Sequence, residues 1–281
     1  MKRWALEIDV QLCINCSNCV LATKDEYVGN VFPGYSAEQP KEGIETIKIE
    51  RHARGDGSLT DVSNIHKTCN HCDDAPCIKA AGDGSIYKRP DGIVMIDPVK
   101  AKNRRDLVDA CPYGMILWNQ EAEVPQNWNF DAHLLDAGWI EPRCAQACPT
   151  GAIRALKLDD QELAKRVEKE ELSVLDPERN TKPRVFYRGL DEVLRHMVTG
   201  NICEIAEGRQ RNLPEAEVIL IDSSEGGKLS TRTNAFGDFR FEGLSAEVST
   251  VELLVRRDGA ETRIASAQRS GNLNFGTLCI D

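Results

Sequence analysis

The sequence lacks long apolar runs and any excess of positive charge. No segment of the 281 residues approaches the roughly 20 apolar residues of a membrane-spanning helix, and the first ten residues contain no secretory signal. The formal net charge of -10 argues against nucleic-acid binding, because phosphates bind to basic surfaces. We therefore expect a soluble, cytoplasmic protein with no membrane span and no nucleic-acid partner. Export together with a folded partner that carries the signal is the alternative.

The residue patterns of an active site are also missing. The histidines are scattered, and none has a serine or a carboxylate at a catalytic spacing. The sequence contains neither a phosphate-binding glycine loop nor a dinucleotide fingerprint. We predict that the chain has no catalytic residues and acts as a non-catalytic subunit.

Length and composition predict two domains. Residues 1–200 contain nine of the eleven cysteines, and the proline-containing segment 174–200 is expected to connect this domain to the next. Residues 160–173 have an acidic first turn, and Leu163, Val167 and Leu172 lie roughly at helical spacing, so we expect a surface helix there. Residues 201–281 contain short strand-like runs separated by glycine-containing turns, which predicts a small β-sandwich. The clearest of these runs are 217–222, 239–241 and 251–255.

Two groups of three cysteines have the spacing of iron-sulfur ligands. In the bacterial motif C-x2-C-x2-C-x3-C-P, three cysteines bind one cluster and the fourth binds its neighbour. The fourth position is occupied by Thr23 in the first motif and by Ala81 in the second. The two triples are Cys13, Cys16 and Cys19, and Cys69, Cys72 and Cys77 with a slightly wider spacing.

In two further motifs, the cysteine of the fourth position is present, as Cys111 and Cys148, and the triple is incomplete. Each of these cysteines precedes a proline within a repeated phrase. Two triples lack their fourth cysteine, and two Cys-Pro cysteines lack a complete triple. Each triple can therefore be completed by one of these cysteines, and the sequence predicts two 4Fe-4S clusters with four thiolates each. Spacing alone permits either cysteine to complete either triple. The missing ligand positions are occupied by Ala101, Arg104 and Leu107 before Cys111, and by Trp128 and Asp131, with Cys144 retained, before Cys148.

Zinc and a third cluster are alternatives that fit the spacing less well. Zinc ribbons pair two C-x2-C knuckles and do not combine a triple with a distant Cys-Pro. A third cluster would need a ligand at Trp128, and an indole cannot bind iron. We expect Trp128 and Leu107 to fill the vacated sites, because a cavity of that size would be destabilising. Cys144 is then expected to be a free buried thiol.

Three remaining residues could take more than one role. His71 lies inside the second triple, where it is either a hydrogen-bond donor to cluster sulfur or an ordinary loop histidine. Cys203 and Cys279 belong to the predicted β-sandwich. Because they are isolated in the sequence, we expect them to be core residues.

The cysteine motifs, together with the phrases Tyr87-Lys-Arg-Pro-Asp-Gly and Cys111-Pro-Tyr-Gly, resemble those of iron-sulfur subunits of the dimethyl sulfoxide reductase family. This resemblance covers residues 8 to about 156. Within the family, the phrase Ala132-His-Leu-Leu-Asp, the connector Thr181-Lys-Pro-Arg-Val and the appended β-domain are most similar to small subunits of pyrogallol-phloroglucinol transhydroxylases and resorcinol hydroxylases. Those small subunits look like three-cluster proteins, and Thr23, Trp128 and Asp131 remove the ligands of one cluster here.

The resemblance implies an α+β fold, in which a double bacterial-ferredoxin-like domain precedes an immunoglobulin-like or prealbumin-like β-sandwich. It also implies which cysteines share a cluster, because the family pairs its first motif with its fourth and its second with its third. Carried over, cluster 1 is held by Cys13, Cys16, Cys19 and Cys148, and cluster 2 by Cys69, Cys72, Cys77 and Cys111.

The implied function is electron transfer within a heterodimer. The large partner would hold a molybdenum or tungsten bis-pterin and catalyse anaerobic hydroxylation or hydroxyl transfer on polyphenols, and an external electron carrier is a further expected partner. One alternative is a structural subunit whose clusters stabilise the fold. Another is an electron-transfer subunit of a different reductase, such as a catechol dehydroxylase.

Overall fold

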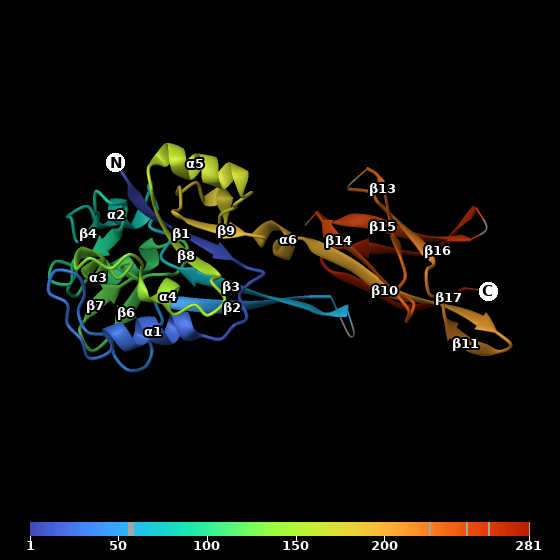
Figure 1. Cartoon of the computed structure of the whole chain (residues 1–281), viewed down its shortest axis with the longest axis horizontal. Coiled ribbons are helices and arrows are strands. Elements are labelled where there is room, and N and C mark those ends of the chain that lie inside the picture. The colour runs from blue at the N-terminus through green and yellow to red at the C-terminus, as the bar shows by residue number, and fades with distance from the viewer. Residues whose placement is uncertain (56–58, 225, 246, 258, 281) are drawn as a thin grey trace. The chain divides into compact units, whose positions relative to one another are not determined.

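The computed structural model describes residues 1–55, 59–224, 226–245, 247–257 and 259–280. The chain divides into two compact units, seen in Figure 1. The first comprises Met1–Arg51 and Asn64–Leu190, and the second comprises His52–Ser63 and Asp191–Asp281. The second unit thus starts before the boundary expected at residue 201, and it includes part of a hairpin from the N-terminal half of the chain.

Hydrogen bonds explain why this hairpin belongs to the second unit. The hairpin consists of β2 (Ile47–Arg54) and β3 (Asp61–Thr68). The buried guanidinium of Arg54 donates to the carbonyl oxygens of Glu192 and Arg195, which follow the first unit in the chain. No local sequence signal predicts a contact between residues so far apart.

A three-stranded sheet organises the first unit. The central strand β1 (Arg3–Asp9) is antiparallel to β8 (Ile153–Leu158) and parallel to β9 (Val185–Arg188). Its five middle residues are buried. Helix α5 (Asp160–Lys169) follows β8 directly, and Asp159 caps it in a capping box. The helix predicted for residues 160–173 is therefore confirmed, although it ends four residues earlier.

Short elements surround the cysteine motifs in the rest of the first unit. Two more strand pairs are formed by β4 (Ile86–Lys88) with β5 (Val94–Ile96), and by β6 (Leu117–Asn119) with β7 (Val124–Gln126). The helices are α1 (Asn18–Tyr27), α2 (Pro76–Ala81), the 3-10 helix η2 (Arg105–Ala110), α3 (Ala132–Asp136), α4 (Arg143–Gln146) and the 3-10 helix η3 (Pro177–Arg179). This mixture of helices and strands is compatible with the predicted α+β class.

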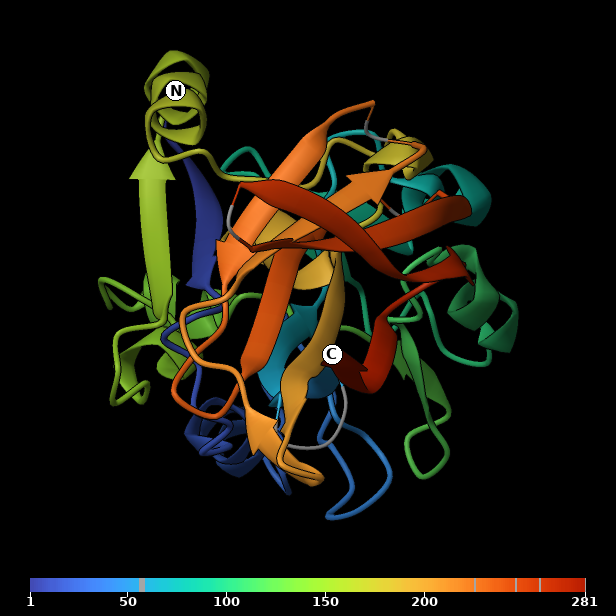
Figure 2. The same ribbon diagram turned by 90° about the vertical axis from the view of Figure 1, so that its right-hand side faces the viewer.

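Two four-stranded sheets form most of the second unit, and helix α6 (Leu190–Leu194) directly precedes their first strand (Figure 2). The first sheet has the antiparallel order β13 (Lys228–Arg232), β12 (Glu217–Asp222), β15 (Ser249–Arg257) and β16 (Ala260–Arg269). The second sheet is built on β10 (His196–Ala206), which pairs antiparallel with β14 (Asp238–Leu244) and β11 (Arg209–Asn212) and parallel with β17 (Leu273–Ile280). Strands β12, β14 and β15 contain the three predicted strand segments.

One apolar core joins these two sheets. Alternate residues of β12 and β15, such as Val218, Leu220 and Leu253, point to the same side as expected for half-buried strands. They pack in one cluster with residues of the other sheet, including Ile202 and Phe239. Because both sheets contribute to a single core, neither sheet is expected to be stable alone.

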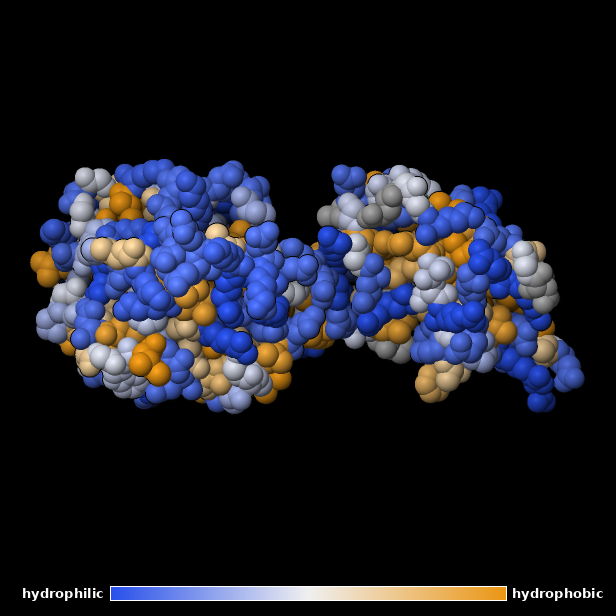
Figure 3. Space-filling model, turned by 45° about the horizontal axis from the view of Figure 1, so that its top comes forward, coloured by the Kyte–Doolittle hydropathy of each residue, from blue (hydrophilic) through white to orange (hydrophobic). Residues whose placement is uncertain are grey.

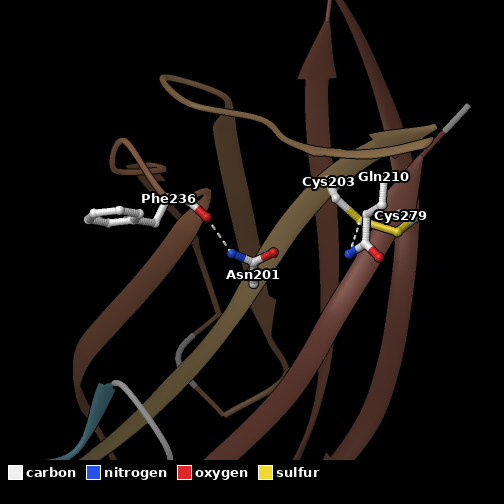
Figure 4. Close-up of a disulfide and its surroundings, with 5 residues drawn as sticks. All are labelled: Asn201, Cys203, Gln210, Phe236 and Cys279. Carbon is white, nitrogen blue, oxygen red and sulfur yellow. Dashed lines mark hydrogen bonds between the residues drawn. A yellow bond between two sulfur atoms is a disulfide. The ribbon is translucent and has the colours of Figure 1, made fainter. Parts of the chain in front are cut away.

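Cys203 and Cys279 are joined by a disulfide, which Figure 4 shows. The expectation that both are core residues is confirmed for Cys203 and wrong for Cys279, and the disulfide between them was not predicted. They lie directly opposite each other on the parallel strands β10 and β17, and Gln210 Nε2 donates to Cys203 Sγ at 3.4 Å. Cys203 is buried, whereas Cys279 is exposed. The pair is separated by 76 residues, so it forms only because the last strand returns beside β10.

Figure 3 shows the distribution of hydropathy on one face of the molecule. On the face in Figure 3, hydrophilic residues predominate and hydrophobic residues form separate patches. Among the residues that the structure describes, no helix is long and apolar enough to cross a membrane.

Removing the disulfide should destabilise the second unit. A bridge that closes a loop of this length stabilises the folded state by roughly 4 kcal/mol, because it restricts the unfolded chain. We expect the double variant Cys203→Ala with Cys279→Ala to unfold at lower urea concentration than the wild type. Dithiothreitol should shift the wild-type midpoint toward that of the variant and leave the variant unchanged. Equal midpoints for the two proteins would show that the bridge contributes nothing.

Candidate iron-sulfur cluster sites

The first triple and one Cys-Pro cysteine line a common cavity. Two of its thiols come from the loop before α1 and one from the first turn of that helix, and the fourth follows α4. They belong to Cys13, Cys16, Cys19 and Cys148. The remaining lining is largely apolar and includes Ile8, Ile49 and Ile153. The register of the central sheet explains the convergence. Ile8 of β1 pairs with Ile153 of β8, so the first triple, which follows β1, and Cys148, which precedes β8, lie at the same end of this strand pair.

The second triple and the other Cys-Pro cysteine line a second cavity. One thiol directly follows β3, a second lies in the loop between β3 and α2, a third lies in α2, and the fourth follows η2. The four residues are Cys69, Cys72, Cys77 and Cys111. Apolar side chains such as Ile86, Val94 and Ile116 complete the walls. The structure therefore groups the first triple with Cys148 and the second with Cys111, and the exchanged arrangement that spacing also permits is not the one it adopts.

The thiols surround these cavities instead of meeting at one point. Among the described residues, no three His, Cys, Asp or Glu side chains are placed to hold a single metal ion. Four thiolates around an apolar space are the donor set of a 4Fe-4S cluster. The residues present therefore fit such a group at both positions.

Hydrogen-bond donors in both sites also suit an anionic cluster. Burial acts to raise the pKa of Cys148, but hydrogen bonds from the Thr150 hydroxyl and nearby backbone N–H groups hold it below its usual range. The backbone N–H of Met115 points to Cys111 Sγ at 3.4 Å. Burial raises the pKa of both Cys19 and Cys77 to about 11, so these thiols must lose protons when metal binds.

One vacated ligand set has become part of an apolar core. Ala81, Ala101 and Leu107 are buried in a cluster with residues of β4 and β5. Arg104 has left the interior and forms surface ion pairs with Asp83 and Asp106. The predicted filling role of Leu107 is confirmed.

The other vacated set is occupied by larger and more polar residues. Trp128 is buried and stacks on Phe130 with ring centroids 4.7 Å apart, which confirms its filling role. Asp131 is fully buried and accepts hydrogen bonds from the Tyr27 hydroxyl and the Arg143 backbone N–H, both at 2.8 Å. Burial raises the pKa of Asp131. Cys144 is a free buried thiol, as predicted.

His71 does not donate to cluster sulfur through its nearer ring nitrogen. The backbone N–H of Val94 donates to His71 Nδ1 at 3.0 Å, so that nitrogen carries no hydrogen. The same atom lies 3.9 Å from Cys69 Sγ. The side-chain donor to this sulfur is Asn127, whose Nδ2 lies 3.3 Å away. Sequence reasoning missed Asn127 because it belongs to no cysteine motif, although it directly precedes the vacated position at Trp128.

A partly buried lysine, Lys88, contacts the loop of the second triple. Lys88 Nζ donates to the carbonyl oxygens of His71 and Cys72 at 2.8 and 2.9 Å and pairs with Asp73 at 2.8 Å. Burial lowers the pKa of Lys88, and the carboxylate of Asp73 opposes this effect. The lysine thereby satisfies two backbone carbonyls of the loop between Cys69 and Cys77. Its role was not predicted from the sequence.

Comparisons with known proteins identify relatives of this chain. The model of the 4Fe-4S dicluster domain family matches residues 60–158. The small subunit of pyrogallol hydroxytransferase from Pelobacter acidigallici is 40% identical over 98% of this chain and 99% of its own length. A tetrathionate reductase subunit from Salmonella typhimurium is 31% identical over 68% of this chain and 74% of its own. A thiosulfate reductase electron transfer subunit from Salmonella typhi is 29% identical over 58% of this chain and 81% of its own.

These relatives share the cysteine-bearing part of the chain, and the first of them also aligns with the appended β-strands of the second unit. Taken with the two four-thiol cavities, they show that the chain belongs to the iron-sulfur subunits of the dimethyl sulfoxide reductase family of molybdopterin enzymes.

Proposed function

We propose that this chain is the two-cluster electron-transfer subunit of a heterodimeric enzyme whose large subunit carries a molybdenum or tungsten bis-pterin. The observation that carries the proposal is the pair of cavities, each lined by four thiols. Bound there, 4Fe-4S clusters would supply one-electron chemistry. The chain's own residues hold the ligands, direct N–H groups at the sulfurs and exclude water with apolar walls. Cluster 1 would be held by Cys13, Cys16, Cys19 and Cys148, and cluster 2 by Cys69, Cys72, Cys77 and Cys111.

The surroundings of the first site support exchange of electrons with a partner. Cys16 is exposed, and so are the nearby apolar side chains of Leu12, Ile14 and Leu21, with Ile14 64% exposed. An apolar rim beside an exposed ligand can be covered by another protein and brings the two redox centres close together. We assign this rim to contact with the large catalytic subunit. An external electron carrier would then approach elsewhere.

We further propose that the complex acts in anaerobic hydroxylation or hydroxyl transfer on polyphenols. The support is the 40% identical small subunit of pyrogallol hydroxytransferase, which aligns over nearly the whole chain. The tetrathionate and thiosulfate reductase subunits align over a smaller part. A different reductase, such as a catechol dehydroxylase, is the alternative for the partner reaction.

For the second unit we retain the immunoglobulin-like or prealbumin-like sandwich, which its two sheets and common core support.

A structural role is the second candidate function, and the filled third site favours it. Trp128 and Asp131 occupy positions at which this family can carry cluster ligands, so the path for electrons could be interrupted there. Clusters would then serve mainly to hold distant segments together. Metal binding contributes to folding free energy, which makes this role physically reasonable.

Iron content and substrate response distinguish these functions. We expect about eight irons and eight acid-labile sulfides per chain in anaerobically purified complex, as two 4Fe-4S clusters require. If the chain carries electrons, the electron paramagnetic resonance signal should change when substrate is added. Eight irons with an unresponsive signal would support the structural role. About twelve irons would contradict the two-cluster assignment.

A ligand variant separates electron transfer from assembly. Cys13→Ser should abolish turnover while the heterodimer still forms, as measured by co-purification and activity, because only one cluster is perturbed. Cys144→Ala is the matched control, since this free buried thiol is not expected to bind iron. The control should retain about eight irons. Loss of co-purification in Cys13→Ser before any loss of turnover would favour the structural role.

The disulfide between Cys203 and Cys279 is relevant to the cellular compartment in which the protein acts. The sequence favours the cytoplasm, but structural disulfides persist mainly in oxidising compartments. We propose that the complex is exported folded with its partner, and that Cys203 and Cys279 are oxidised there. Cells lysed in excess N-ethylmaleimide should yield the disulfide-linked peptides in mass spectra. Quantitative alkylation of both cysteines would instead support a cytoplasmic protein.

A further inference from the structure

Asn127 makes two hydrogen bonds with one amide group at the second cavity. It follows β7 and is buried. Its Nδ2 donates to Cys69 Sγ at 3.3 Å and to the carbonyl oxygen of Val94 at 3.1 Å. A side-chain amide nitrogen carries two hydrogens, so both bonds can exist at once. The bond to Val94 fixes the direction in which the other hydrogen points.

Geometry identifies the side-chain donor to Cys69. Asn127 Nδ2 lies 3.3 Å from Cys69 Sγ, and among the described residues His71 is the other side chain within hydrogen-bonding reach of this sulfur. The His71 imidazole cannot take over through Nδ1, because that nitrogen accepts a hydrogen bond from Val94. Asn127 is thus the side chain that donates to this sulfur.

We propose that Asn127 is a positioning residue that raises the reduction potential of the cluster held by Cys69, Cys72, Cys77 and Cys111. One electron enters the cluster on reduction, and no covalent bond forms or breaks. The added negative charge is shared with the thiolate sulfurs, so an N–H donor stabilises the reduced form more than the oxidised form. The inference rests on the proposed cluster 2.

The location of Asn127 gives a second function to a segment that has lost its own ligands. Trp128 and Phe130 pack their rings against His71 with centroids 5.5 and 5.4 Å apart. His71 belongs to the loop that carries Cys69 and Cys72. The vacated segment therefore covers the second cavity, and Asn127 is its polar contact with a ligand sulfur.

The test is an anaerobic potentiometric titration of the purified heterodimer, followed by electron paramagnetic resonance. Asn127→Leu removes the donor with little change in side-chain volume. We expect the midpoint potential of cluster 2 to become more negative, while cluster 1 in the same sample stays unchanged and acts as an internal reference. Gln126→Leu is the matched control. It removes the adjacent buried amide, which donates to the Ala37 carbonyl oxygen at 2.8 Å and, among the described residues, forms no hydrogen bond with a cysteine.

The possible results separate this inference from the proposed function. Full iron content with an unchanged cluster 2 potential in Asn127→Leu would overturn the role of Asn127 and leave the two-cluster assignment intact. Equal shifts in Asn127→Leu and Gln126→Leu would also overturn it, because they would indicate a general packing effect. A wild-type protein without about eight irons would contradict the proposed function itself. If Asn127→Leu does not fold, Asn127→Asp preserves the shape, and its carboxylate should lower the potential further.

Discussion

Four sulfur atoms must converge around each cluster, and this requirement governs the whole first unit. Three of them come from one short loop, so the local chain can position them. The fourth comes from a distant segment, and tertiary structure must bring it into place. At the first site the pairing of β1 with β8 does this, since Cys13 follows one strand and Cys148 precedes the other. The central sheet is therefore part of the ligand-positioning apparatus. Its buried middle residues maintain the register on which the fourth ligand depends.

The two vacated ligand sets show different ways of replacing a metal group. Around Leu107, small and aliphatic residues close the space and form an apolar core. Around Trp128 the replacement includes Asp131, whose burial is offset by hydrogen bonds from Tyr27 and Arg143. A buried carboxyl group needs such partners, because an unpaired one costs several kcal/mol. Burying Asp131 therefore requires specific hydrogen-bond partners, whereas the aliphatic residues around Leu107 require none. These hydrogen bonds also hold the segment that contains Trp128 and Asp131 in position.

The features that sequence analysis predicted are local in the chain. The cysteine triples have fixed spacings, the helix after Asp159 has a capping signal, and the strand-like runs of β12, β14 and β15 are separated by glycine-containing turns. The features that it missed join distant residues. The disulfide depends on the return of β17 to β10, and the donation by Asn127 to Cys69 depends on how the vacated segment folds back. Composition and spacing contain no information about either contact. His71 was a reasonable candidate from its position, and only the Val94 N–H showed that its nearer nitrogen is an acceptor.

The same chain contains cysteines that need opposite redox chemistry. Cluster ligands must be free thiolates when metal binds, whereas Cys203 and Cys279 must be oxidised. Oxidation before cluster insertion would threaten the exposed Cys16 most, because thiolates react with disulfides and oxidants according to their access. Inserting the clusters first, under reducing conditions, protects the ligands by coordination. In the proposed export of the folded complex, the disulfide would form when the complex enters an oxidising compartment. This order would reconcile the two kinds of cysteine, whereas an order of assembly in which the disulfide forms first would not.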